Sequence, residues 1–304
     1  MELRHFRYFL AVAEELNFTR AAVKIGIGQP PLSQQIRDFE NELGEPLFRR
    51  LARGVELTAA GRALLPEAHA MMVLAERAKK SAQRGARGEI GHLRVGFTGS
   101  ASFYSLVSES LRVFQKKYPD VELSLEEADT TRLLDLLARE NIDAAFIRPG
   151  IASSKAALLY PLVEEAMAIV LPSKHPLAKF THLPLSALAE ETFVLFPRKA
   201  SVEWFDEIIA SCRQTGFEPI LGQEAPQITS VGNLVAAELG ISLVPISIAK
   251  QIKIAGIRYV NIKGKSPVAK LSLAVRFGER SAIVQKFAAL VNSLKVRSQD
   301  ATAA

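Results

Sequence analysis

One segment, from Gln29 to Gly44, limits the possible folds of this chain more than any other stretch. Its apolar residues recur every three or four positions, which is typical of an amphipathic helix with one buried face. They are Leu32, Ile36, Phe39 and Leu43. The opposite face offers amide, hydroxyl and guanidinium groups, which can bond to base edges and phosphates. That face consists of Pro30, Gln34, Arg37 and Asn41, with Ser33 beside them. An ordinary surface helix has a similar pattern, so the neighbouring residues decide between the two interpretations.

Two shorter helical patterns precede this segment. Apolar residues at helical spacing predict a first helix over residues 3–16, and Thr19 is a suitable N-cap for a short helix that ends near Ile25. Gly26 and Gly28 then predict a tight turn. Helix, short helix, turn and a helix with a polar outer face together indicate a helix-turn-helix. A helical hairpin of a plain bundle shares the periodicity but does not need the two glycines.

A short basic hairpin is predicted directly after this motif. Residues 46–57 have the pattern of two short strands with a turn near residues 52–54, and this region carries Arg49, Arg50 and Arg53. A narrow hairpin with arginine at its tip can enter the minor groove of DNA, where the electrostatic potential attracts that side chain. The alternative is a solvated basic loop.

Residues 58–84 predict one long helix, for which Thr58 is a suitable cap. An apolar seam along it follows alternating spacings of four and three, the repeat of two helices packed side by side. The seam consists of Leu64, Ala68, Met71, Ala75, Ala78 and Ala82. The partner helix belongs either to the same chain or to a second subunit. A flexible joint is expected at residues 83–88.

Beyond the joint, strands and helices alternate in two sets. The first set runs from Leu93 to Ile147, and the second begins with a strand over residues 167–171. This alternation predicts parallel sheets in two α/β lobes. Ligands of such sheets bind beyond the carboxyl ends of the strands, so we expect a binding cleft between the lobes.

Polar residues follow the strands of the first set. Gly99-Ser100 and Asp129-Thr130 fall at strand-to-helix turns, where helix N-termini can hold an anion. Arg148 ends a third strand and can pair either with a ligand carboxylate or with an acidic side chain of the protein. Each residue taken alone is explained by helix capping or a structural ion pair, but together they favour a binding site.

The composition excludes several other classes of protein. A net charge of +6 is compatible with a nucleic-acid partner. Cys212 is the only cysteine, so there is no intrachain disulfide and no cysteine-based metal site. We find neither a transmembrane run nor a signal-peptide core, which predicts a cytoplasmic protein without a membrane partner. Motifs of phosphate-binding enzymes, α/β hydrolases and zinc proteases are absent, so we expect neither an enzyme nor a cofactor.

Residues Met1–Gly61 resemble the winged helix-turn-helix of the LysR-type transcriptional regulators. The matching positions are Leu3, Phe6, Phe9, Ala21-Ala22, Gln29-Pro30, Ser33, Ile36, Glu40, Leu43-Gly44, Leu47-Phe48, Arg50, Arg53, Leu57-Thr58 and Gly61. The resemblance implies an N-terminal all-α winged helix-turn-helix with a long linker helix, followed by a two-lobed α/β effector domain similar to periplasmic binding proteins. The implied DNA-binding residues are Thr19, Gln29, Pro30, Ser33, Gln34, Arg37, Arg50 and Arg53. Gly28 and Gln34 depart from the family, where Ser and Arg are frequent.

The resemblance also divides the chain. It implies the winged helix-turn-helix over 1–58, a linker helix that pairs two subunits with its hinge over 59–88, and an effector-binding domain over 89–298. Lobe I of that domain comprises 89–162 and 268–298, and lobe II comprises 163–267. The implied effector-binding residues are Gly99, Ser100, Thr130, Arg148, Phe196, Trp204 and Ile228. In this set Gly99, Ser100 and Thr130 would hold a carboxylate, and Trp204 would cover an apolar part of the effector.

Within the family, the opening residues and Gln29–Ser33 most resemble regulators of aromatic-compound catabolism. This implies a homodimeric or homotetrameric activator that binds double-stranded promoter DNA with an interrupted dyad and contacts RNA polymerase. Its inducer would be a small aromatic or dicarboxylic acid. One alternative is an architectural DNA-binding protein without effector control. Another is a solute-binding transport protein, which would leave the basic N-terminal residues unexplained.

Overall fold

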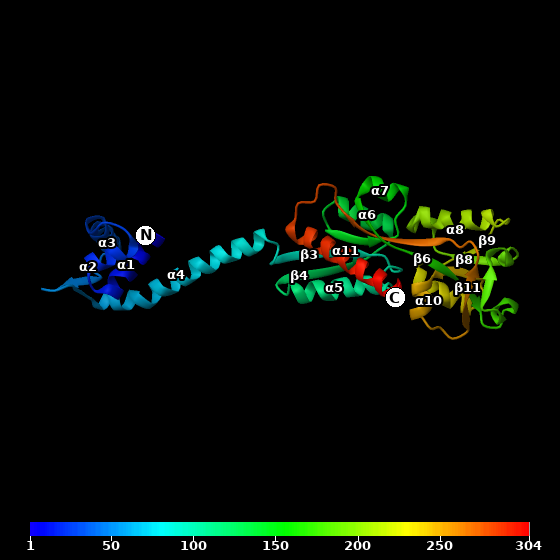
Figure 1. Ribbon diagram of the computed structural model, residues 1–304, viewed down its shortest axis with the longest axis horizontal. Coiled ribbons are helices and arrows are strands. Elements are labelled where there is room, and N and C mark those ends of the chain that lie inside the picture. The colour runs from blue at the N-terminus through cyan, green and yellow to red at the C-terminus, as the bar shows by residue number, and fades with distance from the viewer. Residues whose placement is uncertain (304) are drawn as a thin grey trace. The chain divides into compact units, whose positions relative to one another are not determined.

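The computed structural model describes residues 1–303 and divides into two compact units, Met1–Gly85 and Ala86–Ala304. In the first unit, three helices are followed by an antiparallel hairpin and a long helix (Figure 1). The elements are α1 (Leu3–Glu15), α2 (Phe18–Ile25), α3 (Gln29–Leu43), β1 (Phe48–Arg50), β2 (Val55–Leu57) and α4 (Ala59–Ala86). The predicted helix-turn-helix, hairpin and long helix are confirmed. Because of the hairpin, the unit is not purely helical.

Local capping explains the helix ends, with one correction. The N-cap of α2 is Asn17 rather than Thr19, because the Asn17 side-chain oxygen accepts hydrogen bonds from the backbone N–H groups of Thr19 and Arg20, at 2.9 and 3.0 Å. Thr19 is exposed in the first turn of α2. As predicted, α3 begins after Gly28 with proline in its first turn and ends at Gly44, which has a φ of 76°.

The hairpin is held against the helices. The Glu40 carboxylate on α3 accepts hydrogen bonds from the backbone N–H groups of Leu47 and Phe48, at 2.7 and 3.1 Å. Gly54 turns the chain with a φ of +85°, and a Cβ at this position would lie 2.6 Å from the carbonyl oxygen of Leu16. A larger residue does not fit there, so the turn depends on glycine.

The long helix α4 begins as predicted, since the Thr58 hydroxyl accepts a hydrogen bond from the backbone N–H of Gly61 at 3.0 Å. The first part of its seam is filled by the same unit, where Ala68 is fully buried in the core. Farther along, Met71 and Leu74 are exposed in the single chain. The helix also continues through most of the expected joint, to Ala86.

The second unit contains a curled mixed sheet of eight strands, with the order β4-β3-β5-β12-β6-β11-β7 and with β10 paired to β6. A separate two-stranded sheet joins β8 to β9. The strands are β3 (Gly91–Phe97), β4 (Val121–Glu127), β5 (Ala144–Ile147), β6 (Leu158–Pro172), β7 (His182–Pro184), β8 (Thr192–Leu195), β9 (Ile220–Glu224), β10 (Ser242–Pro245), β11 (Ile257–Lys263) and β12 (Val268–Val275). The helices are α5 (Ser105–Lys117), α6 (Thr130–Ala138), α7 (Ile151–Ala156), α8 (Val202–Gln214), α9 (Val231–Ala236), α10 (Ile246–Gln251) and α11 (Ala282–Ala303).

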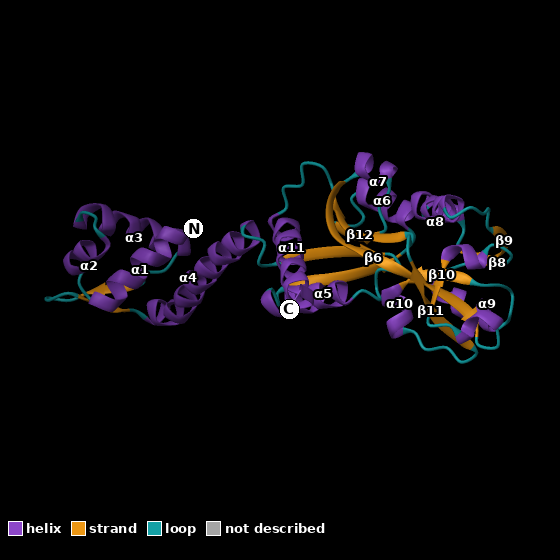
Figure 2. Cartoon of the chain, turned by 45° about the vertical axis from the view of Figure 1, so that its right-hand side comes forward, coloured by secondary structure: helices purple, strands orange, loops and turns teal. Residues whose placement is uncertain are grey.

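Only the first set of strands is parallel throughout. β3 pairs in parallel with β4 and β5, as predicted. β6 instead pairs antiparallel with β10, β11 and β12, so the prediction of a second fully parallel set is wrong. The physical reason is that β6 is one long strand, whose first part pairs with β12 and whose second part pairs with β10 and β11 (Figure 2). The direction of such a strand depends on partners far away in the sequence, which local alternation does not reveal.

Each lobe has its own core. In lobe I, Phe114 and Phe287 pack edge to face with ring centroids 5.2 Å apart, beneath the sheet strands β3, β5 and β12. In lobe II, Phe193 and Ile208 are buried in a separate apolar cluster. Because β6 and β12 contribute residues to both clusters, these strands connect the two lobes.

Candidate nucleic-acid interface and ligand cavity

One face of α3 is exposed and carries side chains that can form hydrogen bonds. Gln29, Pro30, Gln34 and Arg37 all lie on this face. Ser33 does not, since it is only 6% exposed and its hydroxyl accepts a hydrogen bond from Gln29 Nε2 at 2.8 Å. The placement of Ser33 among the exposed residues is therefore corrected: it packs under Gln29 because that flank of the helix faces the core of the unit.

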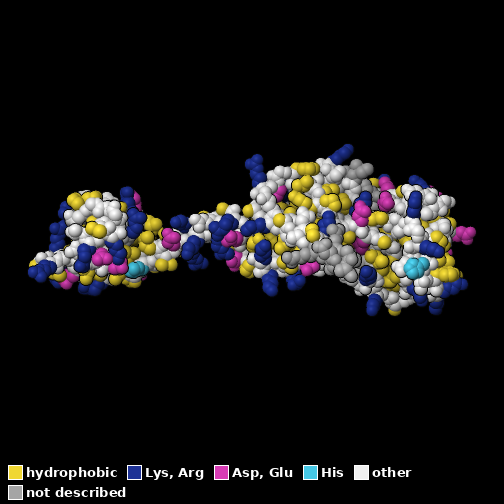
Figure 3. Space-filling model, viewed as in Figure 1, with side chains coloured by type: hydrophobic (Ala, Val, Ile, Leu, Met, Phe, Trp, Pro, Cys, Tyr) yellow, Lys and Arg dark blue, Asp and Glu magenta, His cyan; other side chains and the backbone are white. Residues whose placement is uncertain are grey.

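The hairpin adds positive charge to the same unit. Arg50 and Arg53 are exposed, whereas Arg49 forms an ion pair with Glu56 across the two strands. Lys and Arg side chains are prominent on the surface of this unit in the view of Figure 3. A surface of this kind suits a polyanionic partner, because each arginine can bind a phosphate or enter a narrow groove.

A cavity of about 260 Å³ lies between the two lobes of the second unit. Six of the seven predicted effector residues line it: Gly99, Ser100, Thr130, Phe196, Trp204 and Ile228. They come from the turn after β3, the start of α6, and two regions of lobe II. Asp129, which the sequence analysis placed beside Thr130, also lines the cavity. The sequence analysis missed other lining residues, which are Thr98, Glu127, Ala128, Pro197, Lys199, Ala200, Ser201, Pro226, Gln227 and Thr229.

Local structure fixes the polar side of this cavity. The Asp129 carboxylate caps α6 by accepting a hydrogen bond from the backbone N–H of Arg132 at 2.8 Å, which places Thr130 in the first turn. Thr130 and Ser100 are both buried, and the Ser100 hydroxyl lies 3.3 Å from that of Thr98. The hydroxyls of Thr98, Ser100 and Thr130 and the N-terminus of α6 lie on this side and can donate to an anionic ligand group. The carboxylates of Glu127 and Asp129 line the same cavity, so such a group must bind at the hydroxyls and away from these two side chains.

The opposite side of the cavity is aromatic. Phe196 follows β8, Trp204 lies on α8, and their rings stack with centroids 4.6 Å apart at an angle of 24°. This wall can cover the flat apolar part of a ligand.

Arg148 does not line the cavity, although it lies directly behind Ser100. It is 2% exposed and forms an ion pair with Glu165 at 2.8 Å. Its Nε donates to the Ser100 hydroxyl, its Nη1 to the Ala269 and Lys270 carbonyls, and its Nη2 to the Ser100 carbonyl as well as to Glu165. Each guanidinium nitrogen is thus engaged within the protein, so the structure contains the ion pair and not a free ligand for a carboxylate.

Glu165 joins this pair to lobe II. Its second oxygen accepts a hydrogen bond from the backbone N–H of Ser247, in the first turn of α10, at 3.0 Å. Burial lowers the pKa of Arg148, and the charge and hydrogen bond of Glu165 oppose that shift. The pair therefore links the end of β5 to lobe II behind the cavity.

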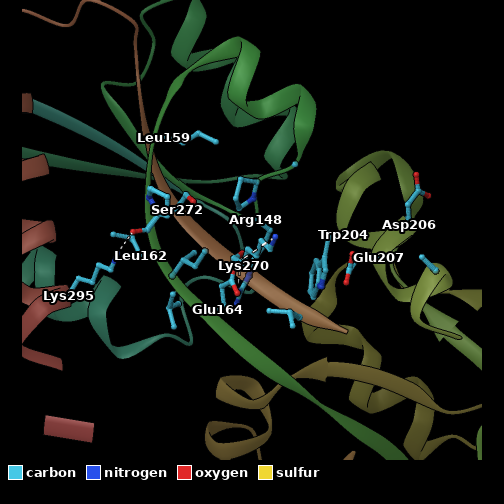
Figure 4. A pocket seen from close by; sticks show the side chains of 17 residues that line it. Arg148, Leu159, Leu162, Glu164, Trp204, Asp206, Glu207, Lys270, Ser272 and Lys295 are labelled. Carbon is cyan, nitrogen blue, oxygen red and sulfur yellow. Dashed lines mark hydrogen bonds and ion pairs between the residues drawn. The ribbon is translucent and has the colours of Figure 1, made fainter. Parts of the chain in front are cut away.

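A wider groove of about 980 Å³ lies beside the cavity and shares Trp204 with it. Trp204 stands on one side of this groove and Lys295 on the other (Figure 4). Lys295 donates a hydrogen bond to the Pro161 carbonyl at 2.7 Å, and Lys270 pairs with Glu164 at 3.8 Å. Because these charged groups have partners within the protein, the smaller cavity is the better candidate for ligand binding.

Two other kinds of feature are absent from the described residues. Among them, no group of His, Cys, Asp and Glu side chains could hold a metal ion. The described helices also include none that is long and apolar enough to cross a membrane.

Comparison with known proteins finds a matching family model for each of the two units. Residues 3–62 match the model of the bacterial regulatory helix-turn-helix proteins of the lysR family, and residues 86–294 match the LysR substrate binding domain. The chain is 39% identical to the HTH-type transcriptional regulator BudR of Raoultella terrigena over 94% of this chain and 99% of that protein. It is 34% identical to the HTH-type transcriptional regulator AlsR of Bacillus subtilis (strain 168) over 100% of this chain and 99% of that protein.

A solved structure covers the same length. The crystal structure of full-length CbnR complexed with its target DNA is similar with a TM-score of 0.80 and 28% sequence identity, over 97% of this chain and 100% of that chain. The similarity therefore includes both units.

Proposed function

The chain belongs to the LysR family of bacterial DNA-binding transcriptional regulators with an effector-binding domain, and from this premise we propose how its two sites act. The exposed face of α3 lies in a major groove, where Gln29, Pro30 and Gln34 face base edges and Arg37 meets the backbone. Arg53 enters the adjoining minor groove, and Thr19 and Arg50 contact phosphates. Their exposure on one small unit supports this assignment.

The effector is a small organic acid bound between the lobes. The observation that carries this proposal is the convergence of six residues, from separate parts of the chain, around one cavity. The hydroxyls of Ser100 and Thr130 and the N-terminus of α6 receive the carboxylate, and Lys199 adds a positive charge to the rim. A volume of about 260 Å³ suits a ligand smaller than a drug-sized molecule, for which pockets of about 300–1,000 Å³ are usual.

The stacked rings of Phe196 and Trp204 favour an aromatic or unsaturated acid. On the resemblance of the opening residues, the regulated genes belong to aromatic-compound catabolism and the protein activates them together with RNA polymerase. The exposed apolar residues Met71 and Leu74 support pairing of α4 with a second subunit, in a dimer or a homotetramer. Two subunits then occupy the two halves of an interrupted dyad.

Ligand binding controls the DNA-binding unit through the lobes. The cavity has residues of both lobes in its walls, so an acid that bridges them stabilises one lobe arrangement over another. Its effect on DNA binding is limited to its difference in affinity for the two arrangements.

The test is a thermal-shift screen of the full-length protein against aromatic acids and dicarboxylic acids. An acid that raises the melting temperature of the wild type should do so much less in Ser100→Ala and Thr130→Ala, because each substitution removes a hydrogen bond to an anion, worth about 1.5–3 kcal/mol. Both variants should still bind DNA. Ser108→Ala, which removes an exposed hydroxyl from α5, is the matched control and should respond like the wild type.

Two results would contradict the proposed site. Unchanged ligand shifts in both cavity variants would place the effector elsewhere. If no organic acid shifts the wild type while the protein still binds DNA, the alternative of a DNA-binding protein without effector control is favoured.

A further inference from the structure

One contact on the exposed face of α3 has no role in packing. Gln34 Nε2 donates a hydrogen bond to Asp38 Oδ1 at 2.8 Å, and both side chains are exposed one helical turn apart. A carboxylate on a surface that meets phosphates weakens binding through charge repulsion. The position of Asp38 therefore needs a specific explanation.

The chemistry of this contact fixes the direction of the Gln34 amide. A glutamine amide has a donor end and an acceptor end of nearly the same shape, and its orientation follows from its partners. An ionised carboxylate only accepts hydrogen bonds, so the amide nitrogen of Gln34 must turn toward Asp38. The amide oxygen then points away from Asp38.

Gln29 on the same helix lacks this restriction. Its Nε2 lies 2.8 Å from the hydroxyl of Ser33, and a hydroxyl either donates or accepts. The Gln29 amide can therefore turn over without losing the contact. Of these two contacts, only the one between Gln34 and Asp38 fixes which end of the amide is the donor.

We propose that Asp38 holds Gln34 as a hydrogen-bond acceptor toward the major groove, and that Gln34 thereby selects a base with an exocyclic amino group. This inference rests on the proposed placement of α3 in the groove. Adenine and cytosine present an amino group there, whereas guanine and thymine present acceptors at the corresponding edge. An acceptor in a fixed orientation bonds to the first two bases and is opposed by the last two.

The same contact is compatible with the usual preference of glutamine for adenine. A free glutamine bonds to adenine in a bidentate manner, because it accepts from N6 and donates to N7. In this protein one N–H of the Gln34 amide bonds to Asp38, and the second N–H of the same group is left to donate to N7. Adenine therefore keeps both bonds, whereas cytosine keeps only the one from its amino group. In water such an exposed side-chain pair is weak, but a groove that excludes water strengthens it.

The experiment selects DNA from a random duplex library with the full-length wild type and with Asp38→Ala, Gln34→Ala and the double variant Gln34→Glu/Asp38→Ala. At one position of each half-site, the wild type should enrich adenine most and cytosine next, both over guanine and thymine. Asp38→Ala frees the amide to turn its donor end toward the groove, so the discrimination against guanine and thymine should fall by about fivefold or more. Gln34→Ala should lose the preference at that position alone.

The double variant tests directly whether a hydrogen-bond acceptor at position 34 sets the base preference. Its glutamate is acceptor-only, so it should again exclude guanine and thymine, now with cytosine ahead. Glu45→Ala removes one negative charge just beyond α3 and is the control for charge, since it should raise affinity for all sequences without changing base preference. Circular dichroism checks that each variant keeps its helix content.

Two results would overturn the proposal. If Gln34→Ala alters the base preference but Asp38→Ala retains that of the wild type, Asp38 does not set the orientation of Gln34. If Gln34→Ala itself has the wild-type preference, Gln34 contacts no base. A wild type that binds no duplex at all would be a different failure, because it removes the proposed DNA binding along with this inference.

Discussion

The exposed face of α3 and the inter-lobe cavity are built in opposite ways. On α3, the candidate contacts are exposed and come from one short run of sequence, from Gln29 to Arg37. In the cavity, Ser100 and Thr130 are buried and meet Trp204 from a distant part of the chain. An exposed contact can change without loss of the fold, whereas a buried one is also part of the core. Substitutions should therefore separate function from stability in the first region more cleanly than in the second.

Two arginines show this difference in one side-chain type. Arg53 is exposed on the hairpin and is available to a partner. Arg148 is 2% exposed and is engaged by Glu165 and by backbone carbonyls. A buried guanidinium needs such partners, because removal from water is costly for a charge. Burial thus converts a group that could bind a ligand into one that holds the lobes together.

The largest effect is expected from Glu165→Ala. This change leaves the charge of Arg148 buried without its partner, so the free energy of unfolding of the second unit should fall by about 3–5 kcal/mol. Trp204 is the only tryptophan, and its fluorescence during urea denaturation reports on this unit. Glu126→Ala, which removes an exposed acid from β4, is the control and should change little. A loss of unfolding free energy below about 1 kcal/mol for Glu165→Ala would show that the buried ion pair matters no more for stability than an exposed arginine does.

An intermediate effect on function without an effect on stability is expected for the DNA-binding unit. Arg53→Ala should weaken binding to all sequences and lower the slope of log affinity against log salt by about 0.9, the value for one phosphate contact. Gln29→Ala should instead relax sequence discrimination by about 1–3 kcal/mol and keep the salt slope. Gel-shift titrations at several salt concentrations measure both. If both variants keep wild-type affinity and selectivity, the groove placement is wrong.

A smaller, pH-dependent effect is expected at the buried carboxylate of Asp143. Burial raises its pKa, but hydrogen bonds from Arg94, at 2.7 to 3.0 Å, and the charges of Arg94 and Arg276 outweigh burial and lower it below the ordinary value. A lowered pKa in the folded state stabilises the fold above the unfolded pKa, and this contribution is lost as pH falls through the folded pKa.

The measurement compares the wild type with Asp143→Asn by urea denaturation over a range of pH. The wild type should be the more stable at pH 7, and the difference should shrink below about pH 4, the ordinary value for aspartate. The same difference at every pH would mean that the carboxylate charge does not contribute. Such a result would contradict the expectation that the stability of the second unit depends on buried charge.

The smallest effect is expected at Cys212. Burial, with a contribution from the charge of Glu218, raises the pKa of this thiol to about 11, so it stays protonated at neutral pH. Iodoacetamide should therefore leave the native protein unmodified but alkylate it in urea, as mass spectrometry can detect. Cys212→Ala should cost about 1 kcal/mol and leave DNA binding and ligand response unchanged. Rapid alkylation of the native protein would show that the reagent reaches Cys212 in the core of lobe II.

Much of the first unit was predictable from sequence because a helix is set by local hydrogen bonds. The stripe of Leu32, Ile36 and Phe39 and the ends at Gly28 and Gly44 predicted α3 correctly. The errors concern neighbours. A helical projection does not show that the flank with Ser33 faces the core of the unit. It also does not show that the side-chain oxygen of Asn17 accepts a hydrogen bond from the N–H of Thr19.

In the second unit, sequence by itself determined the first parallel strands and, through the family resemblance, the residues around the cavity. Only the tertiary structure decided that β6 runs antiparallel to its partners and that Arg148 is bound by Glu165 and Ser100. The physical reason is that strand direction and the pairing of a buried charge depend on groups far away in the chain. Those groups come into contact only in the folded protein, so no local pattern of residues predicts the contact.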